Sequence, residues 1–181
     1  MRVLVLCSDT GSVDRAFVRK GWVVTSVDWL PRFRPALCVD IMQWEYQAAF
    51  PKDHFQFVWA SPACTHFSLV RTTGGPRDIE GATALVARCL EIAEYFGCEW
   101  CLESPATGLL RRQPLMQGLA WTDTCYCKYG FGSRLGFGIR AISGEAFEPM
   151  PKSAQRGADH ARGGERKQND ECSQAQRSCT A

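Results

Sequence analysis

Short apolar runs alternate with amphipathic segments over the first part of the chain. Residues 3–7 are apolar and residues 22–27 are rich in β-branched side chains, so both are predicted strands. Between them, residues 13–20 have helical spacing, and Gly21 can end that helix. A strand–helix–strand unit of this kind favours a parallel sheet, which binds ligands at the carboxyl ends of its strands.

The alternation continues along the chain. Residues 37–39 and 55–60 are predicted strands, and residues 78–96 carry apolar side chains at three- and four-residue steps, the clearest helical pattern present. Gly97 can end this helix, and residues 99–102 are a fifth predicted strand. The predicted fold class is therefore α/β, with a doubly wound, mostly parallel sheet.

Composition changes this prediction little. With 181 residues, 45% hydrophobic and 22% charged, the chain fits one globular domain, and a net charge of +2 neither indicates nor excludes nucleic acid. Ser8 and Asp9 interrupt the apolar start before a signal peptide or membrane span can form, so we expect a soluble, intracellular protein without membrane association. Its ten cysteines are then expected to be mostly reduced thiols.

The C-terminal segment differs from the rest of the chain. Residues 151–181 contain almost no large apolar side chains and carry six Lys/Arg against four Asp/Glu. A segment this polar cannot build a core. We expect residues 1–150 to form one domain and residues 151–181 a flexible tail.

Four chemically distinctive residues follow predicted strands: Asp28, Asp40, Cys64 and Glu103. Since open α/β sheets bind ligands at this edge, we expect the four to share a site. Asp28 suits the ribose hydroxyls of a nucleoside cofactor, and Asp40 suits an adenine amino group. Glu103, taken alone, can equally be a surface charge.

The turn at residues 7–12 has two interpretations. It can be a plain connection between strand and helix, or Gly11 and Ser12 can let backbone amides approach a cofactor. The turn lacks the Gly-x-Gly-x-x-Gly pattern, which counts against a dinucleotide.

Cys64 lies just beyond a predicted strand, where a structural cysteine is unusual. A helix beginning at Thr65 would favour its thiolate through the helix dipole. His66 is a candidate general base, although a solvated histidine is the simpler interpretation.

Other cysteines and cations have ordinary interpretations. The pairs Cys98/Cys101 and Cys125/Cys127 have poor spacing and orientation for zinc, so no metal site is expected. Arg111, Arg112 and Lys128 are surface charges or phosphate contacts.

Three segments, in the same order, resemble motifs of the DNA (cytosine-5) methyltransferases. Residues 7–11 (Cys-Ser-Asp-Thr-Gly) are similar to the family's Phe-x-Gly-x-Gly turn. Residues 63–68 (Ala-Cys-Thr-His-Phe-Ser) resemble its Pro-Cys-Gln-x-Phe-Ser motif, and residues 103–105 (Glu-Ser-Pro) its Glu-Asn-Pro motif. Residues 103–110 and 126–130 look like compact phage-type members, so the resemblance covers residues 3–130.

The resemblance implies a Rossmann-like fold that uses S-adenosylmethionine. It implies methyl transfer to C5 of a flipped cytosine in DNA, through a covalent adduct on Cys64 and with Glu103 at N3 and the exocyclic amine. Combined with the strand-end argument, the expected cofactor-binding residues are Ser8, Asp9, Thr10, Gly11, Ser12, Asp28, Trp29, Asp40, Ile41, Ser61 and Pro62.

The chain also departs from the family. Ala63, Thr65, Ser104 and Asp9 replace motif residues but leave the nucleophile and the acid in place. Arg134, the third expected catalytic residue, is the only counterpart to the family's Gln-x-Arg-x-Arg motif.

No segment is long enough for a target-recognition domain, and the C-terminal helix that completes the cofactor pocket has no counterpart. DNA is the expected partner. An active enzyme with relaxed sequence preference, an enzyme that needs a separate target-recognition protein, and a degenerate copy whose fold is truncated at its C-terminal end are three open alternatives. An inert protein that binds nucleic acid or cofactor, and a methyltransferase for another substrate, remain as alternatives.

Overall fold

The computed structural model describes residues 1–69, 71, 74–105, 108–125 and 136–142, with the backbone alone at 122–125 and 136–142. The chain divides into two compact units, Met1–Phe147 and Glu148–Ala181. All described residues belong to the first unit. The predicted polar tail, residues 151–181, lies outside them.

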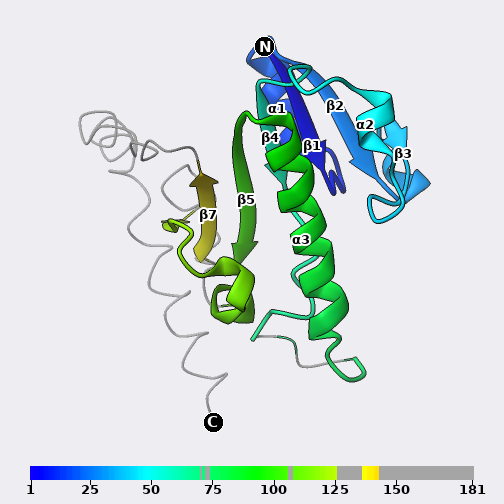
Figure 1. The fold of residues 1–181 in the computed structure, drawn as a ribbon. Coiled ribbons are helices and arrows are strands. Elements are labelled where there is room, and N and C mark those ends of the chain that lie inside the picture. The colour runs from blue at the N-terminus through cyan, green and yellow to red at the C-terminus, as the bar shows by residue number, and fades with distance from the viewer. Residues whose placement is uncertain (70, 72–73, 106–107, 126–135, 143–181) are drawn as a thin grey trace, which may run out of the picture. The chain divides into compact units, whose positions relative to one another are not determined.

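Seven strands in the described part of the chain form one sheet, in the order β3-β2-β1-β4-β5-β7-β6 (Figure 1). β1 (Arg2–Leu6), β2 (Val23–Asp28), β3 (Leu37–Cys38), β4 (Phe57–Ala60) and β5 (Glu99–Pro105) pair in parallel. β7 (Gly136–Ile142) is antiparallel to both β5 and β6 (Thr122–Cys125). The predicted α/β class with a mostly parallel sheet is confirmed, whereas β6 and β7 were not predicted.

Two α-helices of eight or more residues accompany the described strands, α1 (Ser12–Arg19) and α3 (Ile79–Phe96). α3 begins where Oδ1 of Asp78 accepts a hydrogen bond from the amide of Gly81 at 2.8 Å, and it ends at Gly97, whose φ of 61° is left-handed. No helix among the described residues is long and apolar enough to cross a membrane. The shorter helices are α2 (Tyr46–Ala49) and the 3-10 helices η1 (Pro31–Phe33), η2 (Leu109–Arg112) and η3 (Pro114–Met116).

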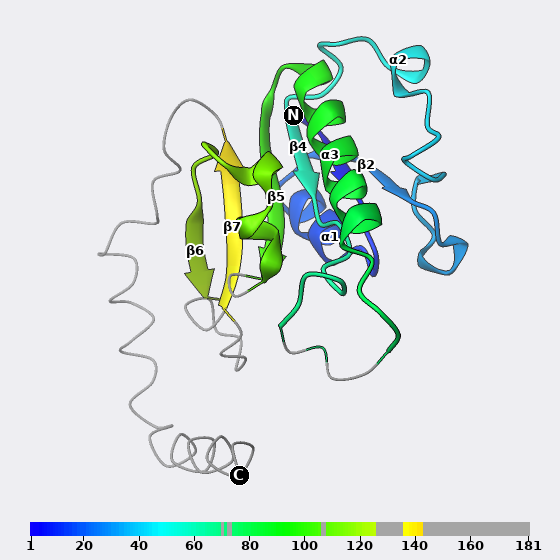
Figure 2. The ribbon, with the colours of Figure 1, turned by 60° about the horizontal axis from the view of Figure 1, so that its bottom comes forward.

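The two faces of the sheet are covered by different helices, as the alternation of side chains on β4 shows. Val58 and Ala60 belong to the apolar core that includes buried residues of α3. Phe57 and Trp59 point to the other face and contact Phe17 of α1, with ring centroids 5.9 and 6.2 Å apart. The sheet is therefore doubly wound, with α3 in front and α1 behind in Figures 1 and 2.

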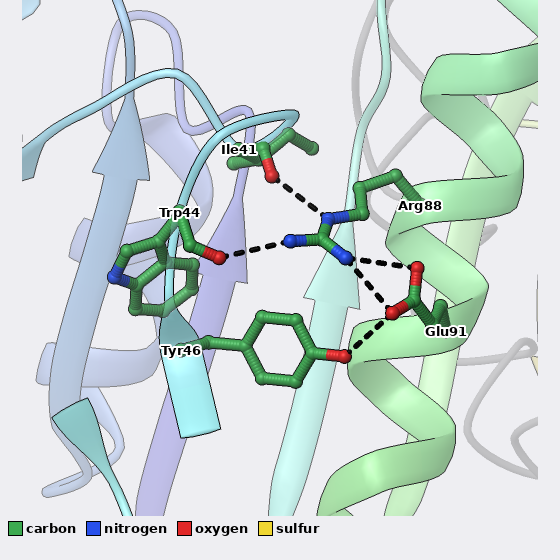
Figure 3. A network of polar contacts seen from close by, with 5 residues as sticks. All are labelled: Ile41, Trp44, Tyr46, Arg88 and Glu91. Carbon is green, nitrogen blue, oxygen red and sulfur yellow. Dashed lines mark hydrogen bonds and ion pairs between the residues drawn. The ribbon is translucent and has the colours of Figure 1, made fainter. Parts of the chain in front are cut away.

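Arg88 of α3 fastens the segment that follows β3 (Figure 3). Its guanidinium donates to the carbonyl oxygens of Ile41 and Trp44, each at 2.9 Å, and pairs with Glu91 at 2.8 Å. The hydroxyl of Tyr46 donates to the same Glu91 carboxylate at 2.8 Å, and burial together with this bond raises the pKa of Tyr46 to about 12. The segment between β3 and α2 is thereby held against α3.

We expect Arg88→Met to lower the free energy of unfolding by about 2–3 kcal/mol, because two carbonyl groups lose a charged donor. Glu91→Gln is the matched control, since it keeps both carbonyl contacts and an amide oxygen that can accept from Tyr46, and removes a partly exposed ion pair worth about 0–1 kcal/mol. Urea denaturation measures the free energy of unfolding of both variants. Equal losses in the two variants would show that the carbonyl contacts do not hold the segment.

Candidate functional site

A pocket of about 790 Å³ opens at the carboxyl edge of the parallel strands. Its walls come from the segments that follow β1, β2, β3 and β4, from the last residues of β5, and from Leu85 of α3. The volume lies in the range of small-molecule sites, about 300–1,000 Å³. The lining residues expected from the sequence are Asp9, Asp28, Trp29, Asp40, Ile41, Ser61, Pro62, Cys64 and Glu103.

Four expected site residues that the structure describes do not line the pocket. Ser8 is buried, and its amide donates to the carbonyl of Val27 at 3.2 Å. Gly11 takes a left-handed φ of 68°, and Thr10 and Ser12 are exposed. These four residues shape the turn but do not line the pocket. Arg134 lies outside the described residues.

The structure adds wall residues that sequence reasoning missed. Arg32 and Phe33 belong to η1, which follows the end of β2, and Val39 directly precedes Asp40. The signal for Arg32 and Phe33 was their closeness to a strand end, with a proline to start a turn. Leu85 is one of the regularly spaced apolar residues of the predicted helix 78–96, and this spacing cannot distinguish a core position from a pocket wall.

Asp28 holds the first turn in place. Its Oδ2 accepts the amide of Asp9 and its Oδ1 accepts the amide of Leu30, both at 2.9 Å. Asp9 has a φ of 45°, a conformation that glycine adopts more easily, and the related motif has glycine here. Because each carboxylate oxygen has a second lone pair, Asp28 can still accept a bond from a ligand hydroxyl.

The side chains of this wall fit a nucleoside cofactor. Trp29 is 68% exposed and offers an aromatic face, while Ile41 is 4% exposed and apolar. The exposed carboxylate of Asp40 accepts the amide of Met42 through Oδ1 at 3.0 Å and follows β3 directly. An aromatic face and an apolar side chain can contact a base, and carboxylates can accept hydrogen bonds from ribose hydroxyls.

Cys64 begins a turn and not a helix. The amides of Phe67 and Ser68 both donate to its carbonyl oxygen at 2.9 Å, after which the helical conformation stops. Thr65 therefore does not begin a helix, and no stack of peptide dipoles follows Cys64 to favour the thiolate. Instead, burial raises the pKa of the Cys64 thiol, and the negative charge of Glu103 raises it further.

His66 fastens the loop formed by residues 64–68. Its Nδ1 accepts the amide of Asp78 at 2.8 Å, and its carbonyl oxygen accepts a bond from Nη1 of Arg77 at 2.9 Å. The same Arg77 nitrogen donates to the carbonyl of Ser68 at 2.7 Å. His66 does not line the pocket, so its contacts support a role in holding the loop and not in taking a proton.

Glu103 lies within β5 and not at its end. The strand runs beyond the predicted boundary because Ser104 and Pro105 continue to pair with β7, which was not predicted. The pairing with β4 ends one residue before Glu103. Ser61, the first residue after β4, donates its hydroxyl to Oε2 of Glu103 at 3.0 Å.

The segments that follow β4 and β5 are joined by backbone hydrogen bonds. The amide of Leu109 donates to the carbonyl of Phe67 at 2.8 Å, and the amide of Gly108 donates to that of Pro105 at 3.0 Å. A Cβ atom at Gly108 would lie 3.1 Å from the Pro105 oxygen and 3.4 Å from the Phe67 oxygen. Glycine therefore permits the close approach that links the Cys64 loop to the Glu103 strand.

The remaining cysteines form no metal centre in the part of the chain that the structure describes, where no group of three or more His, Cys, Asp or Glu residues could hold an ion. Cys98 and Cys101 are free thiols, and burial raises the pKa of each. Cys127 lies outside the described residues.

The chain is similar to known proteins in both sequence and fold. It is 31% identical over 148 residues to a protein of Frog virus 3 (isolate Goorha) described as "Probable DNA (cytosine-5)-methyltransferase", covering 74% of this chain and 68% of that protein. No family model matches the chain.

Two solved structures share the fold. One is a mutant of DNMT2 from Spodoptera frugiperda (TM-score 0.55, 16% identity, 83% of this chain and 52% of that chain). The other is the Dnmt2 methyltransferase of S. pombe (TM-score 0.54, 14% identity, 84% of this chain and 54% of that chain). This chain thus spans about half the length of these two structures.

We expect Glu103→Gln to speed the alkylation of Cys64 by iodoacetamide at a fixed pH near 8. Removing the negative charge lowers the pKa of the thiol, and the thiolate is the reacting form. In the native chain the rate at Cys64 should keep rising above pH 8.5, about the pKa of an ordinary thiol. Peptide mass spectrometry follows Cys64 separately from the other cysteines.

The matched control is Glu99→Gln, an exposed carboxylate on the same strand that does not line the pocket. It should leave the Cys64 rate unchanged. A Glu103→Gln rate equal to or slower than the native one would show that the two side chains are not coupled.

Proposed function

Because the chain belongs to the DNA (cytosine-5)-methyltransferase family, we propose that it transfers a methyl group from S-adenosylmethionine to C5 of a cytosine in DNA. One observation carries the proposal: Cys64 and Glu103 line the same pocket as Asp28, Trp29 and Asp40. A nucleophile and a carboxylate that can contact the ring of cytosine thus adjoin a wall suited to a nucleoside cofactor.

The cofactor half of the pocket would be formed by the segments after β2 and β3. Trp29 would stack on the adenine, Ile41 would cover its other side, and the carboxylates of Asp28 and Asp40 would accept ribose and amino hydrogens. When bound, S-adenosylmethionine supplies the methyl group. The turn at residues 8–12 would support this wall, and Ser61 and Pro62 would lie near the methyl donor.

The part of the pocket lined by Cys64 and Glu103 would activate cytosine, by addition of the thiol to C6 and protonation of N3. Flipping the base out of the duplex would bring it into the pocket. As the Cys64 sulfur forms its bond to C6, the ionised carboxylate of Glu103 would take up the thiol proton and pass it to N3, so the ring gains the proton that the thiol loses. After methylation at C5, loss of the C5 proton to water restores the double bond and breaks the bond from sulfur to carbon. The N3 proton returns through Glu103 to the departing sulfur.

The raised pKa of Cys64 fits this proton balance. Burial and the charge of Glu103 keep the thiol protonated, which limits side reactions. A base that is protonated at N3 brings positive charge beside Glu103, and this favours the thiolate when the substrate is present.

Choice of a DNA sequence would require parts beyond this pocket. We propose residues 1–150 as the catalytic domain, with Arg134 as a further catalytic residue and a separate protein as the source of target recognition. The second candidate function is an inert protein that binds cofactor or nucleic acid, favoured by Thr65 and Ser104 in place of the family's residues.

Incubating the full chain with labelled S-adenosylmethionine and DNA that contains 5-fluorocytosine tests the proposal. Fluorine cannot leave C5 as a proton does, so a covalent protein–DNA complex should accumulate in the native chain. Cys64→Ala should abolish the complex, whereas Cys98→Ala, a half-buried thiol that does not line the pocket, should retain it. Cofactor binding without a complex on any DNA would favour the inert alternative.

A further inference from the structure

We propose that Trp59 and Ser61 form a hydrogen-bonded chain that positions the carboxylate of Glu103 toward the target base. Neither residue would touch the reacting atoms of the base, so both are positioning residues. The role of Glu103 in this inference rests on the proposed function. The two hydrogen bonds that link Trp59, Ser61 and Glu103 are present in the structure whatever the function is.

The direction of the hydrogen bonds is fixed by chemistry. Nε1 of Trp59 lies 2.7 Å from Oγ of Ser61, and this Oγ lies 3.0 Å from Oε2 of Glu103. An indole nitrogen can only donate, and an ionised carboxylate can only accept. The Ser61 hydroxyl must therefore accept from Trp59 and direct its single proton at Glu103.

The strands place the three side chains together. Residues two apart on an extended chain share a face, which puts Ser61 on the same face as Trp59. The parallel register of β4 and β5 pairs Trp59 with Cys101, and two residues further along the polypeptide Ser61, just beyond β4, meets Glu103 of β5. The hydrogen bonds from Trp59 through Ser61 to Glu103 therefore run toward the carboxyl edge of the sheet, where the pocket opens.

Trp59, the first residue of this hydrogen-bonded chain, is held in place by aromatic packing against α1. The ring of Trp59 lies 6.2 Å from Phe17 in an edge-on arrangement, and Phe17 also contacts Trp22 at 5.1 Å and Phe57 at 5.9 Å. The position of the indole is thus set by the helix on the opposite face of the sheet from α3.

The hydrogen bond from Ser61 restricts the terminal side-chain torsion of Glu103. The terminal torsion of a glutamate has no sharp rotamer wells, so its two oxygens sample a broad range of directions. A donor held at Oε2 selects one orientation of the carboxylate plane. Acid–base contacts depend steeply on such geometry, and a misplacement of about 1 Å can cost on the order of a hundredfold in rate.

Indole resonances in a ¹H–¹⁵N spectrum test the chain without any activity. Trp59→Phe identifies the Trp59 signal by its loss. Glu103→Gln should shift that signal in the native background but not in a Ser61→Ala background, because the hydroxyl transmits the change. The matched control Glu99→Gln should shift it in neither. If Glu103→Gln does not shift the Trp59 signal, or still shifts it in the Ser61→Ala background, the proposed hydrogen bonds from Trp59 through Ser61 to Glu103 are contradicted.

Kinetics test its role in the reaction. Ser61→Ala should lower kcat about ten- to a hundredfold, the cost of a misplaced catalytic group, with little change in KM for S-adenosylmethionine or DNA. Ser61→Thr, which keeps the hydroxyl, should recover most of the rate. Trp59→Phe should lower kcat when Ser61 is present and should cause no further loss in a Ser61→Ala background. Trp22→Phe, in the same aromatic cluster, should leave kcat unchanged.

The two proposals fail in different ways. A native chain that transfers no methyl group defeats the proposed function, while the indole spectra still decide whether the hydrogen-bonded chain exists. An active native chain whose Ser61→Ala variant keeps the native kcat, or instead raises KM for S-adenosylmethionine, defeats the positioning role and leaves the proposed function standing.

Discussion

The parallel register between β4 and β5 is the constraint on which the candidate site depends. Ala60 pairs with Leu102, so the residues that follow them, Ser61 and Glu103, lie side by side, and their side chains form a hydrogen bond. The chain leaves the sheet after β4, and Cys64 enters the same pocket within a few residues. A shift of one residue would turn Glu103 to the other face of the sheet.

The rest of the fold supports this edge from three directions. Asp28 ties the end of β2 to the first turn, and Arg88 holds the segment after β3 against α3. Gly108 allows the segment after β5 to meet the Cys64 loop. These polar contacts connect loops that contribute little apolar surface of their own, while the core between the sheet and α3 supplies most of the burial.

Much of the sheet was predictable, because β1 to β5 and the long helix have strong periodic patterns with glycine or proline near their ends. Asp28, Cys64 and Glu103 follow predicted strands, which predicted a shared site, and all three line one pocket. β6 and β7 were missed because their sequences are short or rich in glycine, and this error made β5 end too early. The Cys64 turn and the His66 contact with Asp78 depend on tertiary hydrogen bonds, which local spacing cannot reveal.

The central claim is that the cofactor wall and the Cys64–Glu103 pair are parts of one site. A crystal structure of the chain with S-adenosylhomocysteine tests it most directly. The account predicts the adenine against Trp29 and Ile41, the ribose at Asp28, and the sulfur directed toward the part of the pocket lined by Cys64 and Glu103. A ligand bound outside this pocket, or bound with its sulfur turned away from Cys64, would contradict it.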